Sequence, residues 1–137
     1  MAPKRIPSRR EERTVRAGYL AKAEEFLRSA LDNANSRRWN AAALSAIHAG
    51  IAAADAVLVF ERGLRSASQR HEDVLDLLAG PGADRSSALA HLRRILARKN
   101  VVEYESRLFS RGEAEEIVRH AERFLSWART RVRTVAQ

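Results

Sequence analysis

The longest apolar stretch of the chain runs from Ala41 to Phe60 and is rich in alanine. Its exceptions are Ser45, His48, Gly50 and Asp55. Such a stretch is long enough to cross a bilayer, but a mid-span aspartate costs roughly 2.5–3.5 kcal/mol to insert and alanine offsets little of that. Alanine favours helix and lets neighbouring helices approach closely. We therefore expect no membrane span, and predict a central bundle helix over residues 39–62 that ends at Gly63.

Two further long segments carry apolar residues at the spacing of one helical face. This pattern predicts helices over residues 9–35 and 111–134. In a Ser-x-x-Glu capping box, each side chain bonds the backbone N–H of the other residue at the start of a helix. The two helices begin with such boxes, formed by Ser8 and Glu11 and by Ser110 and Glu113.

Shorter helices are predicted over residues 69–79 and 84–99, with Ser68 and Asp84 as their N-caps. A Gly-Pro-Gly sequence separates them and marks a clear break. Residues 100–109 contain two adjacent valines and fit either a continuation of the helix or a short irregular link.

The remaining segments show no strand pattern and no internal repeat. Residues 64–70 are polar and predict a loop, whereas residues 1–7 hold two of the three prolines and predict a disordered basic arm. The predicted fold class is all-α, an up-and-down bundle of about five helices. A chain of 137 residues fits one domain, which we place over residues 8–137.

The charge balance points to a polyanionic partner. The chain has 25 basic and 17 acidic residues, a net charge of +8, and 22 of its basic residues are arginine. Arginine binds phosphate with two hydrogen bonds and stacks on bases, so nucleic acid is a natural partner. A GC-rich genome would also enrich arginine and alanine, and that alternative stays open.

Most familiar catalytic motifs are absent from the sequence. There is no glycine-rich phosphate loop, no His-Glu-x-x-His pair and no nucleophile elbow. The four histidines are never four residues apart, so we expect no metal pair on one helix and no cofactor. The chain has no cysteine, which excludes disulfides and thiolate metal sites. The N-terminus lacks the apolar core of a signal peptide, and we expect a cytoplasmic protein.

One polar stripe stands out on the central helix. His48, Asp55 and Arg62 follow one another at seven-residue intervals, which places them on one face with steps of about 20°. A helix edge that touches water, or a hydrogen-bonded core histidine, would explain this stripe. The alternative is a site that faces another helix or a second subunit.

The order of these signals resembles the HEPN superfamily, the higher-eukaryote and prokaryote nucleotide-binding domains, over roughly residues 14–130. The resemblance rests on the order of eight segments: Leu27-Arg-Ser-Ala-Leu, Trp39-Asn-Ala-Ala-Ala, Ala46-Ile-His-Ala, Ala54-Asp-Ala-Val-Leu, His71-Glu-Asp-Val-Leu-Asp-Leu-Leu, Arg98-Lys-Asn-Val-Val-Glu-Tyr, Glu113-Ala-Glu-Glu-Ile-Val and Ala121-Glu-Arg-Phe. It implies an up-and-down helical domain that homodimerises. Many members are ribonuclease toxins encoded beside a nucleotidyltransferase antitoxin.

The family signature is an arginine, four to six residues and then a histidine, and the signatures of two subunits form one RNA-cutting cleft. Arg98 matches the arginine, and Asn100 is a polar member of the motif. No histidine follows Arg98 at this spacing, and Glu103 occupies the position that the histidine would take after four intervening residues. Tyr104 loosely matches a tyrosine that the antitoxin modifies in some members. Asp55 matches an acidic residue that commonly lies near the cleft.

The resemblance and the residues leave three functions open. The favoured function is an RNA- or nucleotide-binding dimer, with a nucleotidyltransferase as a further candidate partner. The first alternative is a metal-independent endoribonuclease toxin, in which Arg98 stabilises the phosphorane and Glu103, Tyr104 or a displaced histidine assists. The second alternative is an all-α protein-interaction scaffold. The candidate contacts for RNA or a partner are His48, Asp55, Arg62, His71, Asn100 and Arg107. We also expect Asp55 to lie close to Arg98, within one chain or across a dimer.

Overall fold

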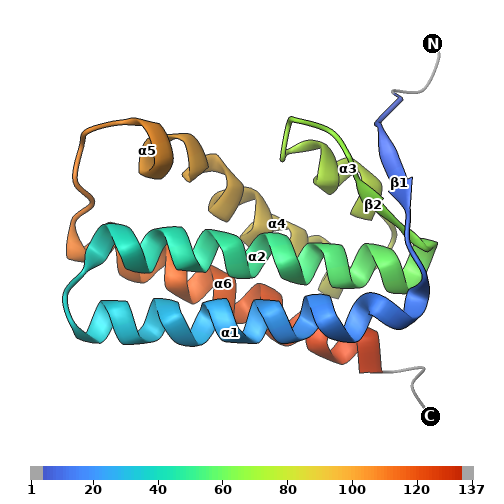
Figure 1. Ribbon diagram of the computed structural model, residues 1–137, viewed down its shortest axis with the longest axis horizontal. Coiled ribbons are helices and arrows are strands. Elements are labelled where there is room, and N and C mark those ends of the chain that lie inside the picture. Colours follow the sequence, from blue (N-terminus) through green and yellow to red (C-terminus); the bar gives the residue numbers. More distant parts are fainter. Residues whose placement is uncertain (1–4, 134–137) are drawn as a thin grey trace.

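Three long helices form the main bundle of the molecule. They are α1 (Arg16–Asn35), α2 (Trp39–Arg62) and α6 (Arg111–Arg133), and in the computed structural model, which describes residues 5–133, they pack against one another. Figure 1 shows α1 and α2 running antiparallel in front of α6. The predicted all-α class is confirmed, and the bounds of α2 agree with the predicted 39–62.

Three shorter helices cover the other side of α2 (Figure 1). They are α3 (Asp73–Leu78), α4 (Ala83–Ala97) and α5 (Lys99–Tyr104). Each of them contacts α2, and α4 also packs along α6. The central helix is therefore covered on most of its circumference, and 72% of its most apolar window is buried, although it is long and apolar enough to span a membrane.

Small side chains let the neighbours of α2 approach it closely. Ala42, Ala46, Ala49 and Ala53 are completely buried. At Gly50 an added Cβ would lie 3.3 Å from two atoms of the Ile95 side chain on α4. A larger residue at this crossing would push α4 outward, which explains why the helix carries glycine in its interior despite the cost in helix propensity.

The N-terminal segment differs from the prediction. Ser8–Arg10 is a short strand, β1, that pairs antiparallel with a second strand, β2 (Leu64–Ser66). Ser8 and Glu11 therefore form no capping box, and α1 begins only at Arg16, after a turn of 3-10 helix. The predicted helix start near residue 9 and the predicted loop over residues 64–70 were wrong at this point.

The antiparallel pair of β1 and β2, which we call the ribbon, depends on contacts between residues distant in sequence. Gly63 takes the left-handed conformation, φ 63°, that ends α2 as predicted. Its carbonyl then accepts the Glu11 N–H at 3.0 Å, and the Pro7 carbonyl accepts the Ala67 N–H at 2.8 Å. Pro7, which we had placed in a disordered arm, is thus held by the ribbon, and residues 1–4 of that arm lie outside the described residues.

The ends of the other helices test the remaining predictions. The second capping box is confirmed, because Glu113 N–H donates to Ser110 Oγ at 3.2 Å and Ser110 N–H donates to Glu113 Oε1 at 3.0 Å. Ser68 was wrongly predicted as an N-cap, because α3 begins only at Asp73 and Glu72 precedes it; the Ser68 hydroxyl donates instead to Asp73 Oδ2 at 2.6 Å. Asp84 lies in the first turn of α4 and is not its N-cap either.

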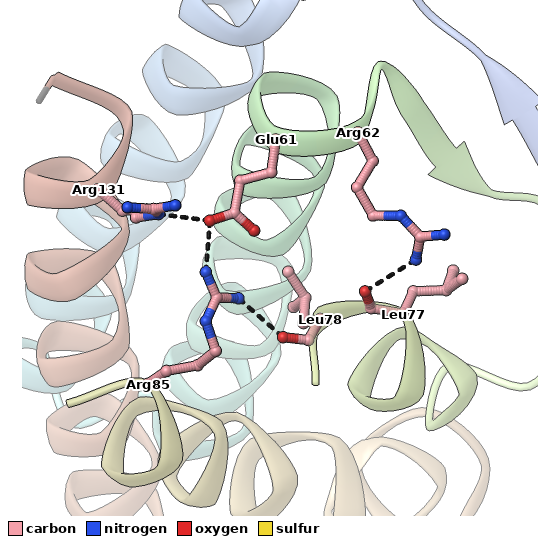
Figure 2. Close-up of polar contacts among 6 residues, drawn as sticks. All are labelled: Glu61, Arg62, Leu77, Leu78, Arg85 and Arg131. Atoms are coloured by element: carbon pink, nitrogen blue, oxygen red, sulfur yellow. Dashed lines mark hydrogen bonds and ion pairs between the residues drawn. The ribbon is translucent and has the colours of Figure 1, made fainter. Parts of the chain in front are cut away.

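A cluster of charged side chains ties the end of α2 to three other helices. Both Arg85 of α4 and Arg131 of α6 donate to the same oxygen of Glu61, as Figure 2 shows. Arg85 also donates to the carbonyl of Leu78 at 2.7 Å, which satisfies the end of α3. Burial raises the pKa of Glu61, but the two arginines outweigh burial and hold this pKa below its usual value.

The close packing of α2 predicts the effect of enlarging its alanines. Ala53→Leu should lower the free energy of unfolding by about 1–3 kcal/mol, because the added atoms have no space to occupy. Ala41→Leu is the matched control, since Ala41 is an exposed position of the same helix. Urea denaturation measures both variants. Equal midpoints for the two would contradict the packing described here.

The Glu61 cluster predicts a second loss of stability. Glu61→Gln should lower the free energy of unfolding by about 1.5–3 kcal/mol at neutral pH, because two arginines lose their charged acceptor. The folded pKa of Glu61 lies below 4.5, so its contribution is present above that pH and is lost as the pH falls through the folded value. The gap between wild type and variant should therefore close in acid. A gap that stays constant down to pH 2 would show that the charge of Glu61 is irrelevant.

Candidate functional site

A pocket of about 250 Å³ lies where α2, α3 and β2 meet. Its apolar wall comes from Ile51, Ala54, Val74 and Leu96. Its polar wall comes from both strands, α2 and the segment before α3: Arg9, Asp55, Arg65, Ser66, Ser68 and His71. A concave, partly open pocket with apolar walls and a few convergent polar groups is a common form of a small-ligand site.

Asp55 is the buried charge of this pocket. Its residue is 7% exposed, and Arg65 Nε donates to its Oδ2 at 3.3 Å. The Arg65 guanidinium also lies over the ring of Tyr19, 5.2 Å from its centroid, while the Tyr19 hydroxyl donates to Glu11 at 2.9 Å. The side chains of α1 and the ribbon thus hold Arg65 against Asp55.

Burial shifts the proton affinities of two pocket groups. Burial raises the pKa of Asp55 to about 6, more than the charge of Arg65 lowers it. Burial, with the nearby charge of Lys99, lowers the pKa of His71. At neutral pH the pocket therefore holds a carboxylate close to its titration range and an uncharged imidazole.

A second cluster of charged side chains, around Arg98, lies where α4, α5 and α6 meet. Arg98 Nη1 lies 3.8 Å from Glu113 Oε2, and Arg107 Nη1 lies 3.0 Å from the same oxygen. Lys99 Nζ donates to Glu103 at 2.7 Å. Hydrogen bonds from Arg107 and from the Ser110 backbone hold the pKa of Glu113 at about 2, and the bond from Lys99 lowers the pKa of Glu103.

His71 lies in the pocket and is influenced by the charges of the cluster around Arg98. It lines the pocket, and its pKa responds to the charges of Lys99, Glu103 and His48. The predicted contact of Asp55 with Arg98 does not form within the chain, since Asp55 pairs with Arg65 and Arg98 pairs with Glu113. A contact across a dimer stays a prediction.

The comparisons with known proteins decide the family. A model of the HEPN domain matches residues 17–131. This chain belongs to the HEPN domain family. A solved structure described as an archaeal HEPN homologue superimposes with a TM-score of 0.67 over 85% of this chain and 97% of that one, at 20% identity. That likeness shows the fold, and no curated protein matches the chain.

The polar stripe predicted on α2 separates into three environments in the HEPN domain. His48 packs on the ring of Phe26, with centroids 5.4 Å apart. Asp55 enters the pocket, whereas Arg62 donates to the carbonyl of Leu77 at 3.1 Å (Figure 2). Arg62 thus fits the interpretation of a satisfied helix edge, whereas a functional role of Asp55 in the pocket stays a prediction.

Several pocket residues were not foreseen from the sequence. Arg9, Arg65 and Ser66 lie on the ribbon, and three-residue strands leave no recognisable period-two pattern. The motif residues Asn100 and Tyr104 lie on α5 and are exposed, Tyr104 to 76%. Within residues 5–133 no group of three or more acidic or histidine side chains is arranged to hold a metal ion.

The raised pKa of Asp55 predicts a pH dependence of folding. Between pH 3.8 and about 6 the folded state keeps a proton that the unfolded state has lost, so stability falls as the pH rises. Asp55→Asn should remove this fall. Urea denaturation across pH 4 to 7 measures it, with Asp32→Asn, an exposed aspartate of α1, as control. If the slopes of all three proteins coincide, the Asp55 pKa is not raised.

Proposed function

We propose that this HEPN domain binds single-stranded RNA as a homodimer and does not cut it by the family's arginine–histidine chemistry. The observation that carries the proposal is the state of the carboxylates around Arg98. Glu103 is hydrogen-bonded to Lys99, and Glu113 is hydrogen-bonded to Arg107 and forms a longer ion pair with Arg98. A general base works best unpaired and with a pKa near the working pH. Glu103, in the place of the motif histidine, has a lowered pKa and is a poor base.

The same segment carries groups suited to holding RNA. The side chains of Arg98 and Arg107 are 40% and 46% exposed despite their ion pairs, and the ring of Tyr104 is open to solvent. Arginines neutralise phosphates, and an exposed aromatic ring stacks on any base. The neighbouring pocket adds Arg9, Arg65 and the uncharged His71, which suit a phosphate group and the edge of a base.

The proposal of a homodimer rests on the family and on exposed apolar surface. Leu108, a large apolar residue that follows α5, is 76% exposed, and a second copy that packs against Leu108 would bring the Arg98 segments of two chains close together. A nucleotidyltransferase partner is the further proposal, made from the family alone. Light scattering at micromolar concentration tests the dimer, and a single 15.4 kDa species would count against it.

The alternative, an active ribonuclease toxin, has one specific observation in its favour. His71 is an imidazole with a lowered pKa whose surroundings include Lys99 and Glu103. In that case His71 would accept the proton of the attacking 2′-hydroxyl, and a nearby cation would stabilise the phosphorane. RNA cleavage by the wild type that His71→Ala abolishes, with an unchanged melting temperature, would establish this alternative.

The RNA proposal predicts charge-specific effects on binding. Arg98→Gln and Arg107→Gln should each weaken binding of a labelled single-stranded oligonucleotide, measured by fluorescence anisotropy across a salt series. Each lost phosphate contact should reduce the salt slope by about 1. Arg133→Gln, an exposed arginine at the other end of α6, removes the same charge and should have little effect. If the three variants bind equally, the Arg98 segment is not the RNA site, and if wild type does not bind, the scaffold function is favoured.

A further inference from the structure

Two histidines meet across the contact between α4 and α6, apart from the pocket described above. His91 Nδ1 and His120 Nδ1 lie 2.9 Å apart, and their ring centroids are 5.1 Å apart with the planes tilted by 41°. The centroid separation exceeds the nitrogen separation by about two ring radii. The two Nδ1 atoms therefore point directly at each other.

This contact constrains the protons of the pair. Two Nδ1 atoms at hydrogen-bonding distance need one N–H and one lone pair, because two N–H groups would face each other with no acceptor. Burial, then the charges of His120, Arg123 and Arg94, lowers the pKa of His91. The 2.9 Å contact therefore places the lone pair of one Nδ1 opposite the N–H of the other.

The outer nitrogen of His120 has its own partner. His120 Nε2 lies 3.6 Å from Glu116 Oε1, one helical turn earlier on α6. A carboxylate at this place favours the tautomer with the proton on Nε2, which leaves Nδ1 bare. Metal-binding histidines are commonly oriented in this way by a carboxylate on the nitrogen that does not bind the metal.

We propose that His91 and His120 chelate a divalent transition ion of the class that prefers imidazole, such as Zn²⁺, Co²⁺, Ni²⁺ or Cu²⁺. Zinc–nitrogen bonds of about 2.0–2.1 Å at a tetrahedral angle place the two nitrogens about 3.3 Å apart. Since the two Nδ1 atoms face each other in the absence of an ion, each ring must turn by roughly 35° to aim its lone pair at an ion that lies off the line between them. The shared Nδ1 proton moves to Nε2 of His91, so each ring binds the ion as a neutral imidazole.

The surroundings define the rest of this two-histidine site. A hollow lies on either side of the pair, one lined by Glu116 and His120 and the other by Ser87 and His91, so water can complete the coordination. Two protein ligands and the nearby arginines favour an exchangeable ion over a permanently bound one. Neither histidine lines the Asp55 pocket, so the inference does not depend on the proposed RNA function.

Titration calorimetry with ZnCl₂ tests the site on the full chain. Wild type should bind one ion per chain, and His91→Ala and His120→Ala should each abolish the saturable binding. Glu116→Gln should weaken it about tenfold, through loss of the orienting carboxylate. His71→Ala, which removes a partly buried histidine outside the pair, is the matched control and should bind as wild type does. No saturable binding to wild type, or binding that survives in the two histidine variants, would overturn the proposal.

A measurement on the wild-type protein tests the site even if the histidine variants fail to fold. Zn²⁺ should shift the ¹⁵N resonance of Nδ1 in two histidine rings and leave both rings with a protonated Nε2. A zinc-dependent shift confined to other histidines, or one seen at Nε2 instead of Nδ1, would show that the ion binds elsewhere.

Discussion

The structure depends on how closely its helices can approach α2. Alanines with no exposed surface and Gly50 make this helix narrow, and the side chain of Ile95 fills the space left by the missing Cβ. The apolar area that each alanine buries is small, so stability must come from many close contacts at once. This explains why a single helix can contact five others and still leave room for the polar groups that line the pocket.

The ribbon supplies the cation that the buried Asp55 carboxylate needs. A carboxylate inside an apolar helix face is costly unless a cation or hydrogen-bond donors accompany it. The antiparallel pairing of β1 with β2 brings Arg65 to Asp55 and places Arg9 at the same pocket. The raised pKa of Asp55 shows that the arginine offsets only part of the cost of burial. Natural proteins accept such a cost most often at sites that bind something.

Charge pairing also organises the motif segment of this HEPN domain. Glu113 has two roles. It accepts the Ser110 N–H in the capping box of α6, and it forms ion pairs with Arg107 and Arg98. The arginines are thus held in place at the start of α6 with part of their surface free for a phosphate. The histidine pair of α4 and α6 lies beyond them, and the hollow lined by His120 also touches Arg98. Arg98 of the proposed RNA site and His120 of the proposed metal pair therefore line the same hollow between α4 and α6.

The sequence by itself determined that the three long helices exist, because each has a continuous apolar face. It determined a boundary only where a local signal was correct: Gly63 ends α2 and the Ser110–Glu113 box begins α6, whereas the predicted start of α1 was wrong. It also determined the family, through signals carried by that helical order. Only the tertiary structure decided the ribbon, the partner of Asp55 and the meeting of His91 with His120. Those contacts join residues distant in the chain, and periodicity within one element contains no information about which faces of two elements meet.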